Sequence, residues 1–140
     1  MFQNILLAVD GSDHALRAAK LAGDLARQMT ARELRIVIAF DVIPIYLGEP
    51  DLQIVIEARR NASLNILKTA KETVGAIPGT VTTEMLEGSA AEAVIDAAKQ
   101  NHADLIVMGS RGLGRIAGAV LGSTSQKVVA HAPCPVLIVR

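Results

Sequence analysis

Five short apolar runs alternate along this chain with segments of helical periodicity. The runs are rich in β-branched residues and bounded by Gly, Pro or Asp, a pattern typical of buried strands. They cover residues 5–9, 34–40, 80–86, 105–108 and 136–139. Because strands that alternate with helices form βαβ units, the pattern predicts one parallel sheet with right-handed crossovers and helices on both faces.

The segments between the runs repeat apolar residues at the 3.6-residue period of an α-helix. One stripe covers residues 15–29, and a second begins near Asp51 and continues to about residue 74. Residues 43–50 contain two prolines and a glycine, and we interpret them as an irregular connecting loop.

Two pairs of polar residues predict where the last two helices begin. Ser89 with Glu92, and Ser123 with Gln126, have the spacing of a capping box. Pro133 is expected to end the last helix, because proline cannot continue it.

Composition narrows the class of protein. A length of 140 residues predicts one domain over residues 1–140. The composition is 51% hydrophobic but only 2% aromatic, so we expect a core of Ala, Val, Ile and Leu. The single cysteine, Cys134, excludes an internal disulfide and fits a reducing compartment. No apolar run approaches the roughly 20 residues that cross a bilayer, so we expect a soluble cytoplasmic protein with no membrane partner.

Charge is balanced overall but unevenly distributed. A formal net charge of zero argues against a nucleic-acid partner. Residues 1–104 hold ten basic and fourteen acidic residues, a net −4, whereas residues 105–140 hold four basic residues and no acid. A local positive field favours an anionic ligand. The alternative is that four basic residues over 36 positions are a chance distribution with no functional meaning.

A glycine-spaced array follows the fourth predicted strand. Gly109 and Gly112 come directly after that strand, and Gly122 precedes the hydroxyl residues 123–125. Glycines let a backbone approach a phosphate closely, and the helix beginning near Ser123 adds free N–H groups. The alternative is that Ser123 only caps its helix and the glycines only make turns. We favour a phosphate site, because the whole array follows a central strand in acid-free sequence.

Two familiar phosphate loops fit poorly. Gly109 and Gly114 have Walker A spacing, but Arg115 stands where that motif requires lysine. Gly112, Gly114 and Ala117 mimic a dinucleotide fingerprint, yet they follow the fourth strand and lack the later acidic residue.

A second polar cluster ends the first predicted strand. Asp10 stands where a carboxylate can accept hydrogen bonds from ribose hydroxyls. Asp10 or Ser12 capping the first helix explains the spacing equally well. If the first and fourth strands are neighbours, Asp10 faces Gly109 across the crevice between them.

Other chemistry is sparse. His14, His102 and His131 share no metal-ligand spacing, and exposed positions at helix ends explain them. There is no G-x-S-x-G elbow for a hydrolase nucleophile. We expect Cys134 to be buried and unreactive, and we expect no catalytic residue and no metal-ligating residue.

Over nearly its whole length the sequence resembles the ATP-binding branch of the universal stress protein family. The motif G-x2-G-x9-G-S/T of that branch is matched at every position by Gly109, Gly112, Gly122 and Ser123. Three further segments look like family hallmarks: NILLAVDGS, VMGSRG and APCPVLIV. The resemblance implies an α/β, Rossmann-like domain of the adenine nucleotide alpha hydrolase type. Its five-stranded parallel sheet would have the order 3-2-1-4-5, and a homodimer would form through the last strand.

The resemblance also implies where ATP would bind. Asp10 would bind the ribose, and Ala8, Ala39 and Met108 would line the adenine, with Phe40 as the alternative to Ala39 if the register shifts by one residue. The phosphates, accompanied by Mg²⁺, would be held by five residues: Gly109, Gly112, Gly122, Ser123 and Thr124. Arg111 could add positive charge, and Ser125 a hydroxyl donor.

Two functions from different classes remain open. The first is a regulatory module of the stress response that binds ATP and passes its state to a protein partner. The second is a slow ATPase or autophosphorylating enzyme with Ser123 or Thr124 as acceptor. No general base is evident beside the glycine array, which favours the regulatory module.

Overall fold

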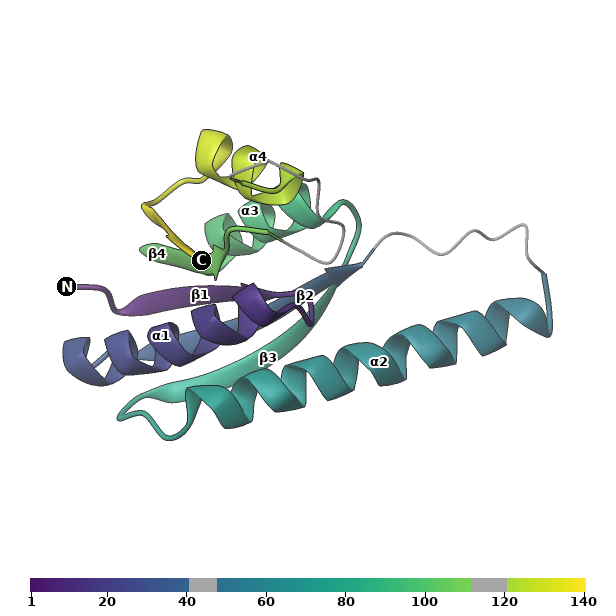
Figure 1. The fold of residues 1–140 in the computed structure, drawn as a ribbon, viewed down its shortest axis with the longest axis horizontal. Helices are drawn as coiled ribbons and strands as arrows, with labels where there is room; N and C mark the ends of the chain where they lie inside the picture. Colours follow the sequence, from purple (N-terminus) through teal and green to yellow (C-terminus); the bar gives the residue numbers. More distant parts are fainter. Residues whose placement is uncertain (41–47, 112–120) are drawn as a thin grey trace.

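The computed structural model describes residues 1–40, 48–111 and 121–140. Its centre is a five-stranded parallel sheet with the order β3-β2-β1-β4-β5, as predicted (Figure 1). The strands are β1 (Asn4–Val9), β2 (Glu33–Phe40), β3 (Thr80–Glu87), β4 (Leu105–Gly109) and β5 (Val136–Val139). Each predicted strand is present, with ends that differ by at most one residue.

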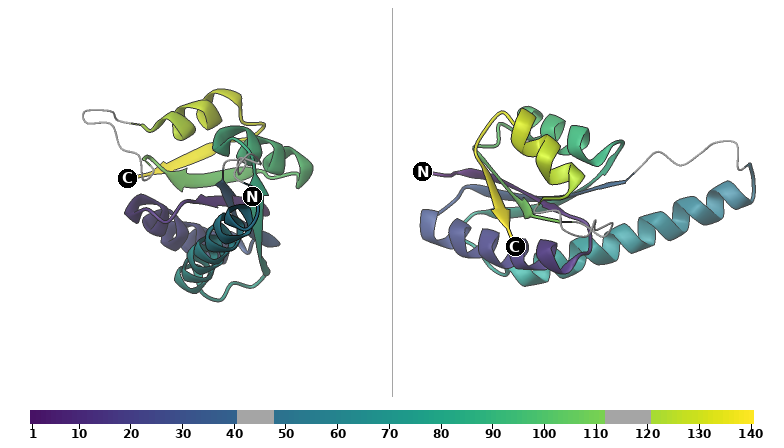
Figure 2. Two further views of the ribbon diagram at one scale, coloured as in Figure 1. Left: turned by 90° about the vertical axis from the view of Figure 1, so that its right-hand side faces the viewer. Right: turned by 45° about the horizontal axis from the view of Figure 1, so that its top comes forward.

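In the described part of the chain, four helices cover the two faces of the sheet (Figure 1, Figure 2). They are α1 (Asp13–Met29), α2 (Asp51–Val74), α3 (Ala90–Gln100) and α4 (Ser123–His131). Helices α1 and α2 lie on one face, and α3 and α4 on the other. None of these helices combines the length and the apolar character needed to cross a membrane.

The core is built from small and branched aliphatic residues on both faces of the sheet. On the α1 side the alanine stripe of α1 packs against Leu7, Ile36 and Val107, all fully buried. On the α3 side Leu6 and Ile106 pack against alanines and valines of α3 and α4. Because the central strands are covered on both faces, their continuous apolar character is explained.

The starts of the last two helices differ from the predicted capping boxes. Ser89 is the N-cap of α3, but its side chain makes no capping hydrogen bond. The N-cap of α4 is Gly122, so the prediction of a cap at Ser123 is wrong. The reason is tertiary: the Gly122 N–H donates to the Ser110 carbonyl (2.7 Å), which fixes the turn into the helix one residue earlier.

Two other predictions about helix ends have different outcomes. Helix α4 ends at His131, and Ala132 is already extended (φ −63°, ψ 145°), as expected for the residue before Pro133. Of the predicted loop at 43–50, residues 43–47 lie outside the described residues, and Gly48 begins the turn that leads into α2.

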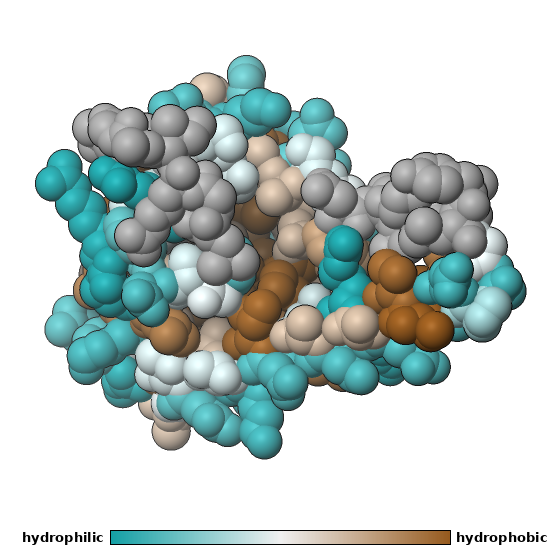
Figure 3. Space-filling view, turned by 45° about the vertical axis from the view of Figure 1, so that its right-hand side comes forward, coloured by the Kyte–Doolittle hydropathy of each residue, from teal (hydrophilic) through white to brown (hydrophobic). Residues whose placement is uncertain are grey.

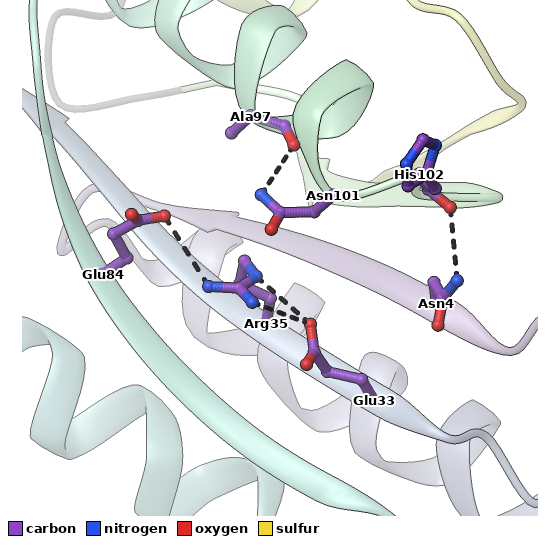
Figure 4. Close-up of polar contacts among 7 residues, drawn as sticks. All are labelled: Asn4, Glu33, Arg35, Glu84, Ala97, Asn101 and His102. Atoms are coloured by element: carbon purple, nitrogen blue, oxygen red, sulfur yellow. Dashed lines mark hydrogen bonds and ion pairs between the residues drawn. The ribbon is translucent and has the colours of Figure 1, made fainter.

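The part of the sheet beside α3 that no helix covers is polar. On β2, Arg35 alternates with buried Leu34 and Ile36 and therefore points to the α3 side. Its guanidinium contacts Glu33 on the same strand (3.1 Å) and Glu84 on β3 (3.8 Å), as Figure 4 shows. These partly exposed ion pairs stabilise the fold only slightly. The Arg35–Glu84 pair, which joins β2 to β3, favours the observed register.

Gly23 tests how closely α1 and α2 pack. A Cβ at Gly23 would lie 3.1 Å from Val74 Cα, and nearer still to the Val74 carbonyl oxygen. We predict that Gly23→Ala lowers the free energy of unfolding by about 1–3 kcal/mol, although alanine favours a helix by about 1 kcal/mol. Denaturant unfolding measures this. Asn61→Ala, at an exposed position of α2, is the control and should be neutral or stabilising; a Gly23→Ala protein as stable as the wild type would contradict the close contact.

Candidate functional site

A cavity of about 240 Å³ opens at the carboxyl ends of the central strands. Strand β1 pairs with β2 on one side and with β4 on the other, so the chain reverses its winding direction between β1 and β4. Parallel α/β sheets bind ligands at such a point. The space-filling view shows this face hollowed, with apolar surface inside the depression (Figure 3).

The cavity gathers the predicted residues from four separate stretches of sequence. Those that line it are Ala8, Asp10, Ala39, Met108, Gly109, Arg111, Gly122, Ser123, Thr124 and Ser125. Gly112 lies outside the described residues. Ala39 lines the cavity, whereas the Phe40 ring lies 5.7 Å from the Arg59 guanidinium carbon.

Sequence reasoning missed six lining residues. They are Val9, Ser12, Ala15, Val37, Ala90 and Val94. Val37 could have been found, because it lies two residues before Ala39 and so on the same face of β2. Ala90 and Val94 carry no local signal, since only the packing of α3 over the sheet brings them to the cavity.

Asp10 has one carboxylate oxygen committed to the backbone. Its Oδ1 accepts the Ser12 N–H (2.9 Å), while Ser12 Oγ accepts the Ala15 N–H (3.2 Å) and caps α1. Ser12, not Asp10, is therefore the cap. The second oxygen of Asp10 has no hydrogen-bond partner among residues 1–40, 48–111 and 121–140, and the side chain lines the cavity.

The N-terminus of α4 opens onto the same cavity. Its N-cap is a glycine, no acidic residue lies in its first turn, and no side chain caps it. In the described part of the chain the N–H groups of Ser123, Thr124 and Ser125 meet no acceptor. Unsatisfied N–H groups at the positive end of a helix dipole form an anion site.

Ser125 differs from its two neighbours because its side chain is structural. It is buried, and its Oγ donates to the carbonyls of Gly109 (2.9 Å) and Ser110 (3.2 Å). Its hydroxyl is therefore committed to the chain itself, and any ligand would meet the Ser125 N–H.

His14 is not explained by an exposed position at a helix end, so that prediction is wrong. The ring is half-buried, and its Nδ1 lies 2.7 Å from Ser110 Oγ. A Cβ at Gly109 would lie only 2.7 Å from His14 Cβ, which gives Gly109 a packing role besides any role toward a ligand. His102 and His131 are exposed near helix ends, as expected.

The remaining candidate chemistry is weak. Cys134 is half-buried and free, and burial, with a smaller effect of the Asp104 carboxylate, raises the pKa of its thiol. A raised pKa lowers the thiolate fraction and fits the expected low reactivity. Nowhere in the described ranges do three His, Cys, Asp or Glu residues form a group that could hold a metal ion.

Comparisons with known proteins agree on one family. The model of the universal stress protein family matches residues 1–140. A universal stress protein of Thermus aquaticus, from the QAH/OAS sulfhydrylase 3′ region, is 48% identical over the full length of both chains. UspA from Lactobacillus plantarum has a TM-score of 0.87 at 29% identity, covering 99% of this chain and 98% of that one. A universal stress protein in complex with cAMP has a TM-score of 0.77 at 31% identity, covering 99% and 97%.

The side-chain hydroxyls of Ser123 and Ser125, both at the start of α4, should contribute differently to stability. We predict that Ser125→Ala lowers the free energy of unfolding by about 1–3 kcal/mol, because two carbonyls lose a buried donor. Ser123→Ala, the matched control at an exposed position in the same turn, should change it by less than about 0.5 kcal/mol. Equal stability losses in thermal or denaturant unfolding would contradict the structural role of Ser125.

Proposed function

Because this chain belongs to the universal stress protein family, we propose that it binds ATP in the cavity between β1 and β4 and acts as a nucleotide-dependent regulatory module. One observation carries the proposal. A partly unpaired carboxylate, Asp10, and the open N-terminus of α4 line the same cavity. A ribose hydroxyl needs a hydrogen-bond acceptor such as Asp10, and a phosphate needs donors such as the N–H groups of α4, so a nucleotide would use both.

The adenine ring would lie against the apolar part of the cavity. Ala8 and Ala39 are small side chains near the ends of neighbouring strands, so they leave room above the sheet. Val37, Val94 and Met108 add apolar surface around that space. A flat aromatic base buries its faces favourably against such side chains.

The ribose would be held by Asp10. One carboxylate oxygen is fixed by the Ser12 N–H, which orients the side chain at the end of β1. The other oxygen would accept a hydrogen bond from a ribose hydroxyl. A hydrogen bond to a charged group contributes about 1.5–3 kcal/mol.

The phosphates would bind at α4 and not at α1, although both helices begin near the cavity. Helix α1 is already capped by Ser12 and has Asp13 in its first turn, so its positive end is neutralised. Helix α4 has neither a side-chain cap nor an acidic residue there. Arg111 also lines the cavity and adds a positive charge that favours an anionic ligand.

Magnesium would be held mainly by the nucleotide. Among the described lining residues Asp10 is the one carboxylate, and we assign it to the ribose. Mg²⁺ commonly binds through substrate phosphates, waters and few protein ligands. Ser123 and Thr124 are the side chains that could contribute a hydroxyl.

Binding, and not turnover, is the function that the described lining supports. Phosphoryl transfer needs a group that orients the attacking water or hydroxyl. Gln126, the first residue after Gly109 that could do so, donates its Nε2 to the Leu121 carbonyl (3.4 Å). The structure of a related universal stress protein with cAMP supports an adenine nucleotide as the ligand.

We further propose that the module is a cytoplasmic homodimer that signals to a protein partner. Strand β5 lies at one edge of the sheet, with apolar residues Val136–Val139 all half-buried in the single chain. An exposed apolar edge favours pairing with another chain, and a two-fold axis would pair β5 with its own copy in antiparallel orientation.

Calorimetry with ATP, adenosine and cAMP tests the assignment of the site. Gly122→Val should abolish ATP binding but barely affect adenosine, because the branched side chain blocks approach of the phosphates only. The fold should survive, since Gly122 has φ −72° and ψ 166°, which valine can adopt. ATP should bind the wild type more tightly than cAMP, because three phosphates reach more N–H groups than one.

Asp10→Asn is the matched variant for the sugar. The asparagine keeps an oxygen for the Ser12 N–H but loses the negative charge. The binding of adenosine and of ATP should therefore weaken by the same amount, about 1–3 kcal/mol. Equal losses for adenosine and ATP at Gly122→Val, or tighter binding of cAMP than of ATP, would overturn the assignment of the phosphates.

The dimer is tested by a charge in β5. Ile138→Lys should yield a monomer in sedimentation at micromolar concentration, or insoluble protein, because the lysine would be buried in a paired apolar strand and against the core. Ile54→Lys, at an exposed isoleucine of α2, is the control and should leave the dimer intact. A wild type that sediments as a monomer would exclude the proposed dimer.

A further inference from the structure

We propose that Ser110 and His14 form a positioning brace that holds the two phosphate-binding segments, residues 109–111 and 122–125, in register with each other. The inference rests on the proposed binding of ATP and assigns a role to two residues that do not line the cavity. Both would act through the backbone that meets the phosphates.

Ser110 is placed within the glycine array but points away from the cavity. Its neighbours Gly109 and Arg111 line the cavity, whereas Ser110 is only 1% exposed and does not. A buried hydroxyl needs a partner inside the protein, and His14 Nδ1 supplies it at 2.7 Å.

The backbone of Ser110 links the end of β4 to two other elements, α4 and β5. Its carbonyl accepts the Gly122 N–H (2.7 Å) and the Ser125 hydroxyl (3.2 Å). Its N–H donates to the Val139 carbonyl at the end of β5 (2.8 Å). Every polar group of Ser110 is therefore bonded within the protein, which leaves none of them to serve a ligand.

His14 connects this residue to the rigid part of the fold. It lies in the first turn of α1, next to Ala15, which is buried in the core. The close approach of His14 Cβ to Gly109 keeps α1 and the end of β4 in contact. A side-chain bond from α1 thus fixes the peptide that Gly122 and Ser125 use as their acceptor.

This arrangement matters because the two segments would have to act together on one ligand. If both segments are held in place before the phosphates bind, less entropy is lost on binding. We therefore expect the brace to affect ATP but not adenosine.

The test compares variants that remove or retain the side-chain bond. Ser110→Ala and His14→Leu each remove it, and His14→Asn retains a polar group near the position of Nδ1. For ATP, each of the first two should weaken binding roughly five- to tenfold, the scale of one net hydrogen bond. The double variant Ser110→Ala with His14→Leu should cost less than the sum of the two single variants, because both remove the same bond. His14→Asn should recover most of the affinity, and adenosine should bind all variants alike.

Ser63→Ala is the control for a general loss of stability. Ser63 is a buried serine of α2 that does not line the cavity, so its variant should bind ATP as the wild type does. A drop in ATP affinity at Ser63→Ala equal to that at Ser110→Ala would overturn the brace, because burial alone would then explain the effect.

A measurement without ligand separates the brace from the proposed function. The Gly122 amide donates to the Ser110 carbonyl, so its hydrogen exchange by NMR should be faster in Ser110→Ala than in the wild type. Unchanged exchange, together with equal ATP affinity, would overturn the brace while ATP binding stands. A wild type that binds no ATP would overturn the proposed function and, with it, the role of the brace toward phosphates.

Discussion

The parallel pairing of β1 with β4 is the contact on which the other features of the molecule depend. It joins the first strand of the chain to a strand some hundred residues later, with Leu6 beside Ile106 and Leu7 beside Val107. All four side chains are buried, so the register is fixed by the core on both faces. Once it is set, Asp10 and Gly109 emerge side by side at the same edge of the sheet.

The helices that begin at that edge differ in how their N-termini are satisfied. Helix α3 begins there at Ala90 with Glu92 in its first turn, and α1 and α4 differ most clearly. The start of α1 is closed by its own serine and carries acid, whereas the start of α4 is left open. The difference follows from one residue: Ser12 can reach back to a backbone N–H, and Gly122 has no side chain to do so. The presence or absence of a capping side chain therefore determines which helix N-terminus is available to an anion.

Much of this was predictable, because the signals were local. Apolar runs, helical periods and two polar start signals predicted the nine elements that the structure describes, and every predicted site residue among the described residues lines one cavity. The strand order came from the family resemblance and not from periodicity. Two of the errors come from tertiary contacts. The Gly122–Ser110 bond places the start of α4 one residue earlier than predicted, and the His14–Ser110 bond involves a histidine for which the sequence indicated no role.

The two edges of the sheet have unlike chemistry. Strand β5 presents aliphatic side chains, whereas β3 presents threonines together with exposed Glu84 and Glu87. Two β3 strands brought together would oppose like charges, which disfavours pairing. If the proposed dimer forms through β5, each subunit buries its apolar edge and leaves its acidic edge exposed. The assembly would then end at two subunits and would not extend into a continuous sheet.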